Sequence, residues 1–150
     1  MISALLVLGL LDGGTSPGVL LDAPAERRIR LSRNAGFTVA GHVLDPYDKL
    51  NFEIDMSALL EEGERFASVD FAVTPASSIL GFTIPDNGAY APFDKDDSHL
   101  ILWPQIDAGK IDAGTWSGQG RLCNFEMTMQ TDSTPPRHWQ RTIAISVAQR

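Results

Sequence analysis

This 150-residue sequence contains only one cysteine, Cys123. A disulfide within the chain is therefore excluded, and folding does not depend on an oxidising compartment. The Asn-x-Ser/Thr motif that accepts N-linked sugars is also missing. Both absences favour a protein assembled in a reducing cytoplasm.

Positive charge and long apolar runs are scarce as well. Twelve basic residues stand against nineteen acidic ones, which gives a net charge of -7 and argues against a surface that follows the phosphates of nucleic acid. The opening run MISALLVLGLL, residues 1–11, is too short to span a bilayer and lacks the basic residue that precedes the apolar part of a signal peptide. We expect neither nucleic acid nor a membrane as a partner.

Motifs of the common catalytic sites are missing too. The three histidines, His42, His99 and His138, show no metal-ligand spacing with one another or with Cys123. Residues 114–120, GTWSGQG, are rich in glycine but lack the Gly-Lys-Ser/Thr ending of a phosphate-binding loop. No nucleophile elbow and no Cys-His pairing occur. We therefore predict a binding protein that has no cofactor and is not an enzyme.

The densest group of carboxylates lies at residues 94–97, where Asp94, Asp96 and Asp97 occur together. Such oxygen-rich loops can bind Ca²⁺, but a calcium site needs six or more ligands and a turn geometry that this run does not specify. We expect a solvated loop, with a calcium site as the alternative.

The pattern that the sequence does contain is an alternation of apolar and polar residues from residue 37 onward. Leu50, Phe52, Ile54 and Met56 form its clearest example, and a period of two is typical of a strand with one buried face. Further runs of this kind occur at residues 37–41, 69–73, 80–84, 100–103, 123–129 and 139–147. About seven short strands without a long helical period predict an all-β fold, an immunoglobulin-like antiparallel β-sandwich.

The first 36 residues differ in composition from the rest and are predicted to form an N-terminal extended arm on a domain of residues 37–150. The arm carries a charge of +1 and the remainder -8, which suits docking of the arm of one copy onto the body of another. The alternative for residues 28–31 is a strand with a solvated arginine face, since Ile29 and Leu31 alternate with arginines. The residues predicted to bind a partner are Leu5, Leu6, Leu8, Leu10, Arg27, Arg28, Arg30 and Arg33.

Four stretches of the sequence together carry a family resemblance. They are DPYDKLNFEIDMSALLEEGE at residues 45–64, SVDFAVTP at 68–75, HLILW at 99–103 and RTIAISVAQR at 141–150. In their order and spacing they resemble the fiber-tail adaptor proteins of tailed bacteriophages. The residues that fit the pattern are Asp45, Pro46, Leu50, Phe52, Asp55, Ser57, Leu60, Ile143, Ile145, Val147 and Arg150, with Met56 where tryptophan is usual. Residues 1–44 and the loops from 91 to 119 lie outside the match.

The resemblance implies a structural virion protein of the tail or neck region, made in the cytoplasm of the host bacterium. Its partners would be other tail, neck and fiber proteins, and several copies would surround the tail axis. Two alternatives are a carbohydrate-binding or adhesion module for the host surface, and a neck or tail-completion protein without a fiber partner. The three tryptophans are predicted to be anchors in the core or at an interface instead of a sugar-binding platform. They are Trp103, Trp116 and Trp139.

Overall fold

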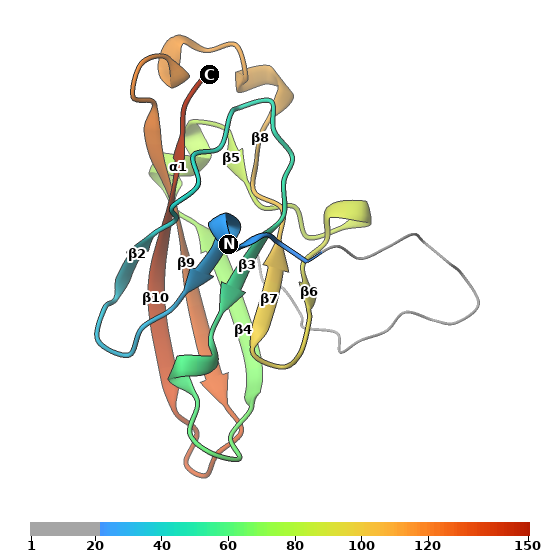
Figure 1. Cartoon of the computed structure of the whole chain (residues 1–150), viewed down its shortest axis with the longest axis vertical. Helices are drawn as coiled ribbons and strands as arrows, with labels where there is room; N and C mark the ends of the chain where they lie inside the picture. The colour runs from blue at the N-terminus through green and yellow to red at the C-terminus, as the bar shows by residue number, and fades with distance from the viewer. Residues whose placement is uncertain (1–21) are drawn as a thin grey trace, which may run out of the picture.

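The computed structural model describes residues 22–150, which are mostly β, with one short α-helix. Two four-stranded sheets make up most of the fold, and their strands run along the long axis of the molecule (Figure 1). The first sheet has the order β1 (Arg28–Arg30), β3 (Phe52–Asp55), β7 (His99–Leu102), β6 (Phe93–Asp94). The second has the order β2 (Phe37–Val39), β10 (His138–Val147), β9 (Arg121–Thr131), β4 (Phe66–Val73).

The smaller elements lie in the connections between these strands. A two-stranded sheet joins β5 (Phe82–Thr83) to β8 (Gln105–Ile106). The helix α1 (Pro75–Ile79) begins with proline in its first turn, where the missing N–H costs no hydrogen bond. Short 3₁₀ turns occur at η1 (Ala25–Arg27), η2 (Ser57–Leu59), η3 (Gly88–Tyr90), η4 (Ala108–Lys110) and η5 (Gly114–Trp116).

Strand pairing is mixed, so the prediction of antiparallel pairing throughout is wrong. Five strand pairs are antiparallel, but β1 runs parallel to β3 and β2 runs parallel to β10. Between β1 and β3 the chain crosses to the other sheet, where it forms β2, and then returns. The alternation of side chains shows which face is buried, but it does not show the direction of the neighbouring strand.

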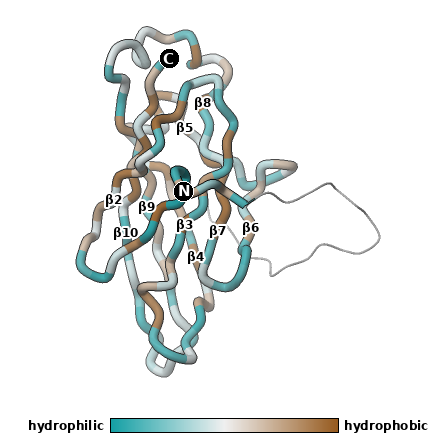
Figure 2. Tube along the Cα trace, in the orientation of Figure 1, coloured by the Kyte–Doolittle hydropathy of each residue, from teal (hydrophilic) through white to brown (hydrophobic). Residues whose placement is uncertain are grey.

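The inner faces of both sheets contribute to one hydrophobic core. In the first sheet Ile54 lies opposite Leu100, and in the second Phe71 lies opposite Met127; all four side chains are buried. The predicted inner stripe of β3 is confirmed, because its phenylalanine Phe52 is 0% exposed and its neighbours on that face are buried or partly buried. Figure 2 shows hydrophobic and hydrophilic residues alternating along these strands.

The predicted inner face of β2, in contrast, is wrong. Phe37 and Val39 are 50% and 49% exposed. Their parallel register with β10 places Phe37 opposite Thr142 and Val39 opposite Ala144, on the outer face of the sheet. The outer surface of the second sheet is therefore partly apolar at this edge.

The arm predicted for residues 1–36 is only partly within the described residues. Leu5, Leu6, Leu8 and Leu10 lie outside them. Residues 28–31, however, belong to the body, since β1 pairs with β3 and the side chains of Ile29 and Leu31 are buried in the core. The boundary predicted after residue 36 thus falls on the wrong side of β1, because two apolar positions among four arginines give too weak a signal of a buried strand.

Candidate functional site

The arginines predicted to bind a partner contact groups of their own chain. The side chain of Arg27 donates to the main-chain oxygen of Asn51 at 2.9 Å and to its Oδ1 at 3.2 Å. Arg28 donates to the carbonyl oxygen of Ala23 at 3.0 Å, and its Nε lies 3.5 Å from Oε2 of Glu53. These two side chains therefore fix η1 and β1 against β3.

Arg30 and Arg33 differ in how firmly they are held. Arg30 lies 3.9 Å from Asp55 and its side chain is 85% exposed. Arg33 donates to the carbonyl oxygen of Ala58 at 2.6 Å and to Oε1 of Glu61 at 3.3 Å. Arg28 and Arg30 thus lie on the outer face of a strand, which is the alternative that the sequence left open for residues 28–31.

A buried carboxylate, Glu53, lies at the centre of an ion cluster on the first sheet. Its side chain is 4% exposed, with Nζ of Lys95 at 3.1 Å and the Arg28 guanidinium at 3.5 Å. Nζ of Lys95 also lies 3.2 Å from Asp22, and the hydrogen bonds that Lys95 donates to Glu53 and Asp22 raise its pKa. A buried carboxylate is stable only when it is paired. The two ion pairs of Lys95 tie Asp22 to β3 and to the residue after β6.

A second ion cluster, of Arg137 with Glu64 and Glu61, joins the loop before β4 to the β9–β10 hairpin, at the end of the molecule opposite the C-terminus (Figure 1). Arg137 donates to both carboxylate oxygens of Glu64, to Oε2 at 2.9 Å, and also to the carbonyl oxygen of Leu59 at 2.8 Å. Its Nη1 lies 3.6 Å from Oε1 of Glu61. The hydrogen bond from Arg137 holds the pKa of Glu64 well below its usual range, so the carboxylate stays ionised.

Replacing Glu64 with glutamine should destabilise the protein at pH 7, because Arg137 loses a charged, two-point partner. Since the folded pKa of Glu64 lies below its unfolded value of about 4.3, its contribution is present above that pH and is lost as the pH falls. Urea unfolding at pH 7 and pH 3 should show a smaller acid-induced loss for Glu64→Gln than for the wild type.

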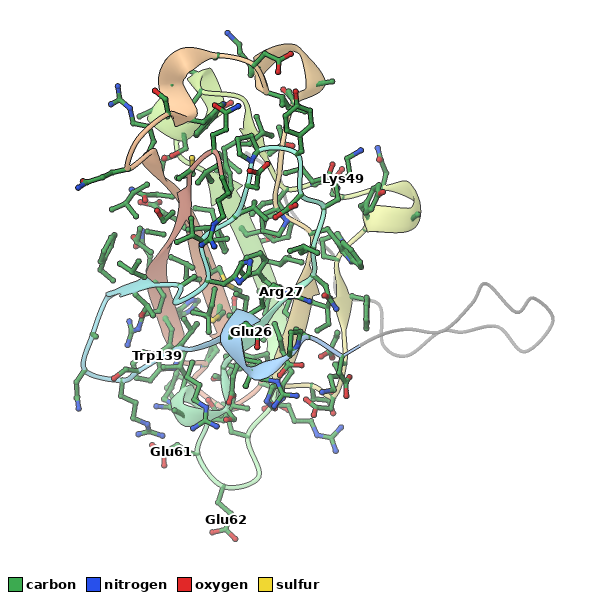
Figure 3. All side chains as sticks on the ribbon, turned by 45° about the horizontal axis from the view of Figure 1, so that its top comes forward. Glu26, Arg27, Lys49, Glu61, Glu62 and Trp139 are labelled. Atoms are coloured by element: carbon green, nitrogen blue, oxygen red, sulfur yellow. The ribbon has the colours of Figure 1, made fainter. Side chains whose placement is uncertain are left out.

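The matched control is Glu62→Gln on the same loop. Figure 3 shows Glu62 at the tip of this loop, pointing away from the body, while Glu61 lies nearer to it. Among residues 22–150 Glu62 has no ion pair, so its replacement should leave the urea midpoint nearly unchanged at both pH values. Equal effects of the two substitutions would contradict the role given to Glu64.

The ring of Trp139 lies beside two guanidinium groups. Cζ of Arg137 is 5.3 Å and Cζ of Arg141 is 4.9 Å from its centroid, within the range of cation–π attraction. Arg141 donates in turn to the carbonyl oxygens of Ser32 at 2.8 Å and Arg33 at 3.0 Å. Trp139 is therefore part of the packing that joins β10 to the segment after β1.

An open depression of about 570 Å³ lies beside the ion cluster of Arg137 with Glu64 and Glu61. Two loops form it, the connection from η2 to β4 and the hairpin between β9 and β10. Its most prominent charges are already paired, since Glu64 binds Arg137 and Glu61 lies beside Arg33. The residues that line it are Glu61, Glu62, Gly63, Glu64, Asp132, Ser133, Pro135 and Arg137.

The carboxylates of residues 94–97 diverge to separate partners. Asp94 is buried, which raises its pKa. Asp96 lies 2.6 Å from Nδ1 of His99, and Asp97 lies 3.4 Å from Arg65. Within residues 22–150 no three acidic, histidine or cysteine side chains form a group that could hold a metal ion. The carboxylates of this loop thus bind separate groups of the chain and do not converge on one point among the described residues.

His99 links this loop to β3. Its Nε2 lies 3.3 Å from Oδ1 of Asp55, so both ring nitrogens face carboxylate oxygens. Burial raises the pKa of Asp55, but hydrogen bonds from Ser57 and the charges of His99 and Arg30 outweigh it and lower this pKa. The carboxylates of Asp55 and Asp96 are thus both engaged by the ring of His99.

Exposed apolar side chains are the feature that the sequence did not indicate as a site. Phe37 and Val39 on β2 and Leu122 on β9 lie on the outer face of the second sheet, because Val39 is opposite Ala144 and Leu122 is opposite Ser146. The signal available in the sequence was the shortness of the run between two glycines, NAGFTVAG at residues 34–41. Such a strand is more typical of a sheet edge than of its centre.

Comparisons with known proteins add no further identification. No protein-family model matches the chain, and neither the curated proteins nor the solved structures give a match. Within the part of the chain that the structure describes, no helix is both long and apolar enough to cross a membrane. The resemblance to fiber-tail adaptor proteins therefore stays a prediction.

Proposed function

We propose that this chain is a structural, non-catalytic protein of a tailed bacteriophage particle, which links tail fibers or neck components to the tail through protein–protein contacts. The observation that carries the proposal is the apolar strip on β2, where Phe37 and Val39 are half-exposed at the edge of a sheet. Exposed apolar residues grouped on one face favour binding to another protein. The family resemblance of residues 45–150 supports the same function.

We also infer that the body is an immunoglobulin-like sandwich. Support comes from the single core to which both sheets contribute and from the long antiparallel pair of β9 and β10. A sandwich of this kind presents sheet faces, edges and end loops for binding. Such surfaces suit an adaptor that must contact more than one neighbour.

The pairing of the polar clusters favours binding over catalysis. A glycoside hydrolase needs a protonated acid and a second carboxylate that face each other across a substrate. Here Glu64 is held ionised by Arg137, and Asp55 accepts hydrogen bonds from Ser57. These carboxylates are engaged in holding loops in place.

The location of the chain in the particle tests the proposal directly. A short tag added after Arg150, which is exposed, should appear in cryo-electron microscopy of the parent phage as repeated density at the junction of the tail with its fibers or neck. Several copies around the tail axis are expected. Purified particles that lack the chain would contradict the proposal.

Two further outcomes would separate the alternatives. Density at the tips of the fibers, together with binding of soluble bacterial polysaccharide, would favour an adhesion module. Density in the neck without contact to a fiber would favour a neck or tail-completion protein. Release of sugar fragments from peptidoglycan, lost on changing one carboxylate, would replace the structural function with an enzymatic one.

A further inference from the structure

Among residues 22–150, β2 is paired on one side only, with β10. The N–H of Thr142 donates to the carbonyl oxygen of Gly36 at 2.8 Å, and the N–H of Ala40 donates to the carbonyl oxygen of Ala144 at 2.8 Å. Because successive residues of a strand direct their backbone groups to opposite sides, those of Phe37 and Val39 point away from β10. This strand is at the edge of the second sheet, so these groups can pair with an added strand.

The other edges of the two large sheets carry charged side chains. β1 exposes Arg28 and Arg30, β4 exposes Asp70, and the two-residue β6 is followed directly by Lys95. Charge on an edge strand opposes the addition of another strand. β2, with the sequence Phe-Thr-Val, is the edge that lacks this protection among those of the two large sheets.

Apolar side chains next to this edge would cover part of an added strand. Phe37 and Val39 lie on the outer face beside Ala144, and Leu122 is 52% exposed on the same face. A strand that pairs with the free side of β2 and carries aliphatic residues on one face would pack against Phe37 and Val39.

The chain itself contains a segment with these properties. Residues 2–11, ISALLVLGLL, hereafter the leucine run, have no charged side chain and include six large aliphatic residues in the last seven. They precede Asp22, which is held beside Lys95 at the end of β6. The ten residues between the leucine run and Asp22, residues 12–21, can span about 35 Å when extended, so the run can reach a neighbouring molecule.

We propose that the leucine run of one copy adds as a strand to the free edge of β2 in a second copy. A second copy is favoured over the same molecule because β6 and β2 lie on opposite sides of the body, as Figure 1 shows. A segment that starts on one side and an acceptor on the other side make a head-to-tail contact, which closes into a ring when the rotation between copies permits it. The inference deepens the proposed function, since it names one partner of the adaptor.

Self-association of the purified full chain tests the inference. Analytical ultracentrifugation should show oligomers that dissociate on dilution. Val39→Lys, which places a charge at the acceptor edge, and Leu8→Lys in the leucine run should each weaken association at least tenfold. The matched control is Ile79→Lys, because Ile79 is also an exposed aliphatic residue but lies on α1, and it should associate like the wild type.

Disulfide cross-linking identifies the contact even if one lysine variant does not fold. Cysteines at Leu8 and Val39 should give covalent oligomers on a non-reducing gel, whereas Leu8→Cys with Ile79→Cys should give none beyond the background. The native Cys123 does not interfere, because burial raises its pKa to about 12 and keeps the thiol protonated.

Several outcomes would overturn the inference. They are a monomeric full chain at all concentrations, association that neither Val39→Lys nor Leu8→Lys weakens, and a cross-link that forms only within one molecule. None of them bears on where the chain sits in the particle. Conversely, a chain that self-associates through β2 but is missing from purified particles would overturn the proposed function alone.

Discussion

Replacing Phe52 with alanine should lower the free energy of unfolding by about 3–5 kcal/mol, the range found when a fully buried phenylalanine is removed. Its side chain is 0% exposed and lies on β3, opposite Leu102. The smaller side chain leaves a cavity in the hydrophobic core beneath β3, and the pairing of β3 with β1 and β7 limits how far the strand can move to fill it. Urea unfolding followed by circular dichroism measures the loss.

Phe37→Ala is the matched control, because it removes the same side chain from an exposed position. Phe37 is 50% exposed on β2, so its replacement should cost no more than about 1 kcal/mol. The measurement should be made at a concentration where the chain is monomeric, since association would stabilise the folded state. Equal losses for the two substitutions would contradict the assignment of the inner and outer faces.

Replacing Gly120 with alanine should also be severely destabilising. Gly120 has φ of +69°, where an alanine costs about 1–2 kcal/mol. A Cβ at this position would overlap the carbonyl oxygen of Val147 and lie 2.7 Å from Cβ of Ala148. Because the obstacle is backbone at the end of β10, relieving the overlap requires the strands to move apart, at a further cost of about 1–3 kcal/mol.

Gly118 separates the two contributions to this effect. Its φ of +67° is nearly the same, but a Cβ there would meet nothing within 4 Å. Gly118→Ala should therefore show the conformational cost alone, and the difference between the two variants should report the clash. Thermal unfolding of both proteins provides the comparison, and a Gly118 variant as unstable as that at Gly120 would contradict the explanation.

The β-rich fold could be predicted from the sequence because the clearest alternation of apolar and polar residues occurs in strands that have a neighbouring strand on each side. β3 occupies an interior position in its sheet, so every apolar residue on its inner face is covered, and the alternation at residues 50–56 is clear. The same holds for β9, where the side chains of Cys123, Phe125 and Met127 are buried in turn. The buried face of a central strand can thus be predicted from the alternation of apolar and polar residues alone.

Edge strands could not be read in this way. On β2 the apolar residues Phe37 and Val39 face outward, and on β1 the buried Ile29 stands between two exposed arginines. A three-residue strand contains too few positions to fix its inner face, and its partner lies far away in the sequence. Both parallel pairs involve these strands. The errors in strand direction, in the buried face of β2 and in the domain boundary therefore share one cause, the shortness of the edge strands.

The candidate site was predictable in its charges but not in its contacts. Composition identifies four arginines at residues 27–33 and an excess of acidic groups in the rest of the chain. Which carboxylates these arginines meet depends on the register of β1 with β3, which places Arg28 opposite Glu53 and Arg30 opposite Asp55. The sequence alone therefore could not distinguish contacts within the chain from contacts between copies.

The parallel register of β1 with β3 has a mechanical consequence. A pulling force transmitted through the residues before Asp22 first meets the ion pairs that join Asp22 to Lys95 and Lys95 to Glu53. Beyond these ion pairs the force reaches β1. A force directed along β1 loads all of its hydrogen bonds to β3 at once, in shear. A force directed across the sheet would instead break these hydrogen bonds one by one. We expect resistance to tension to depend on its direction.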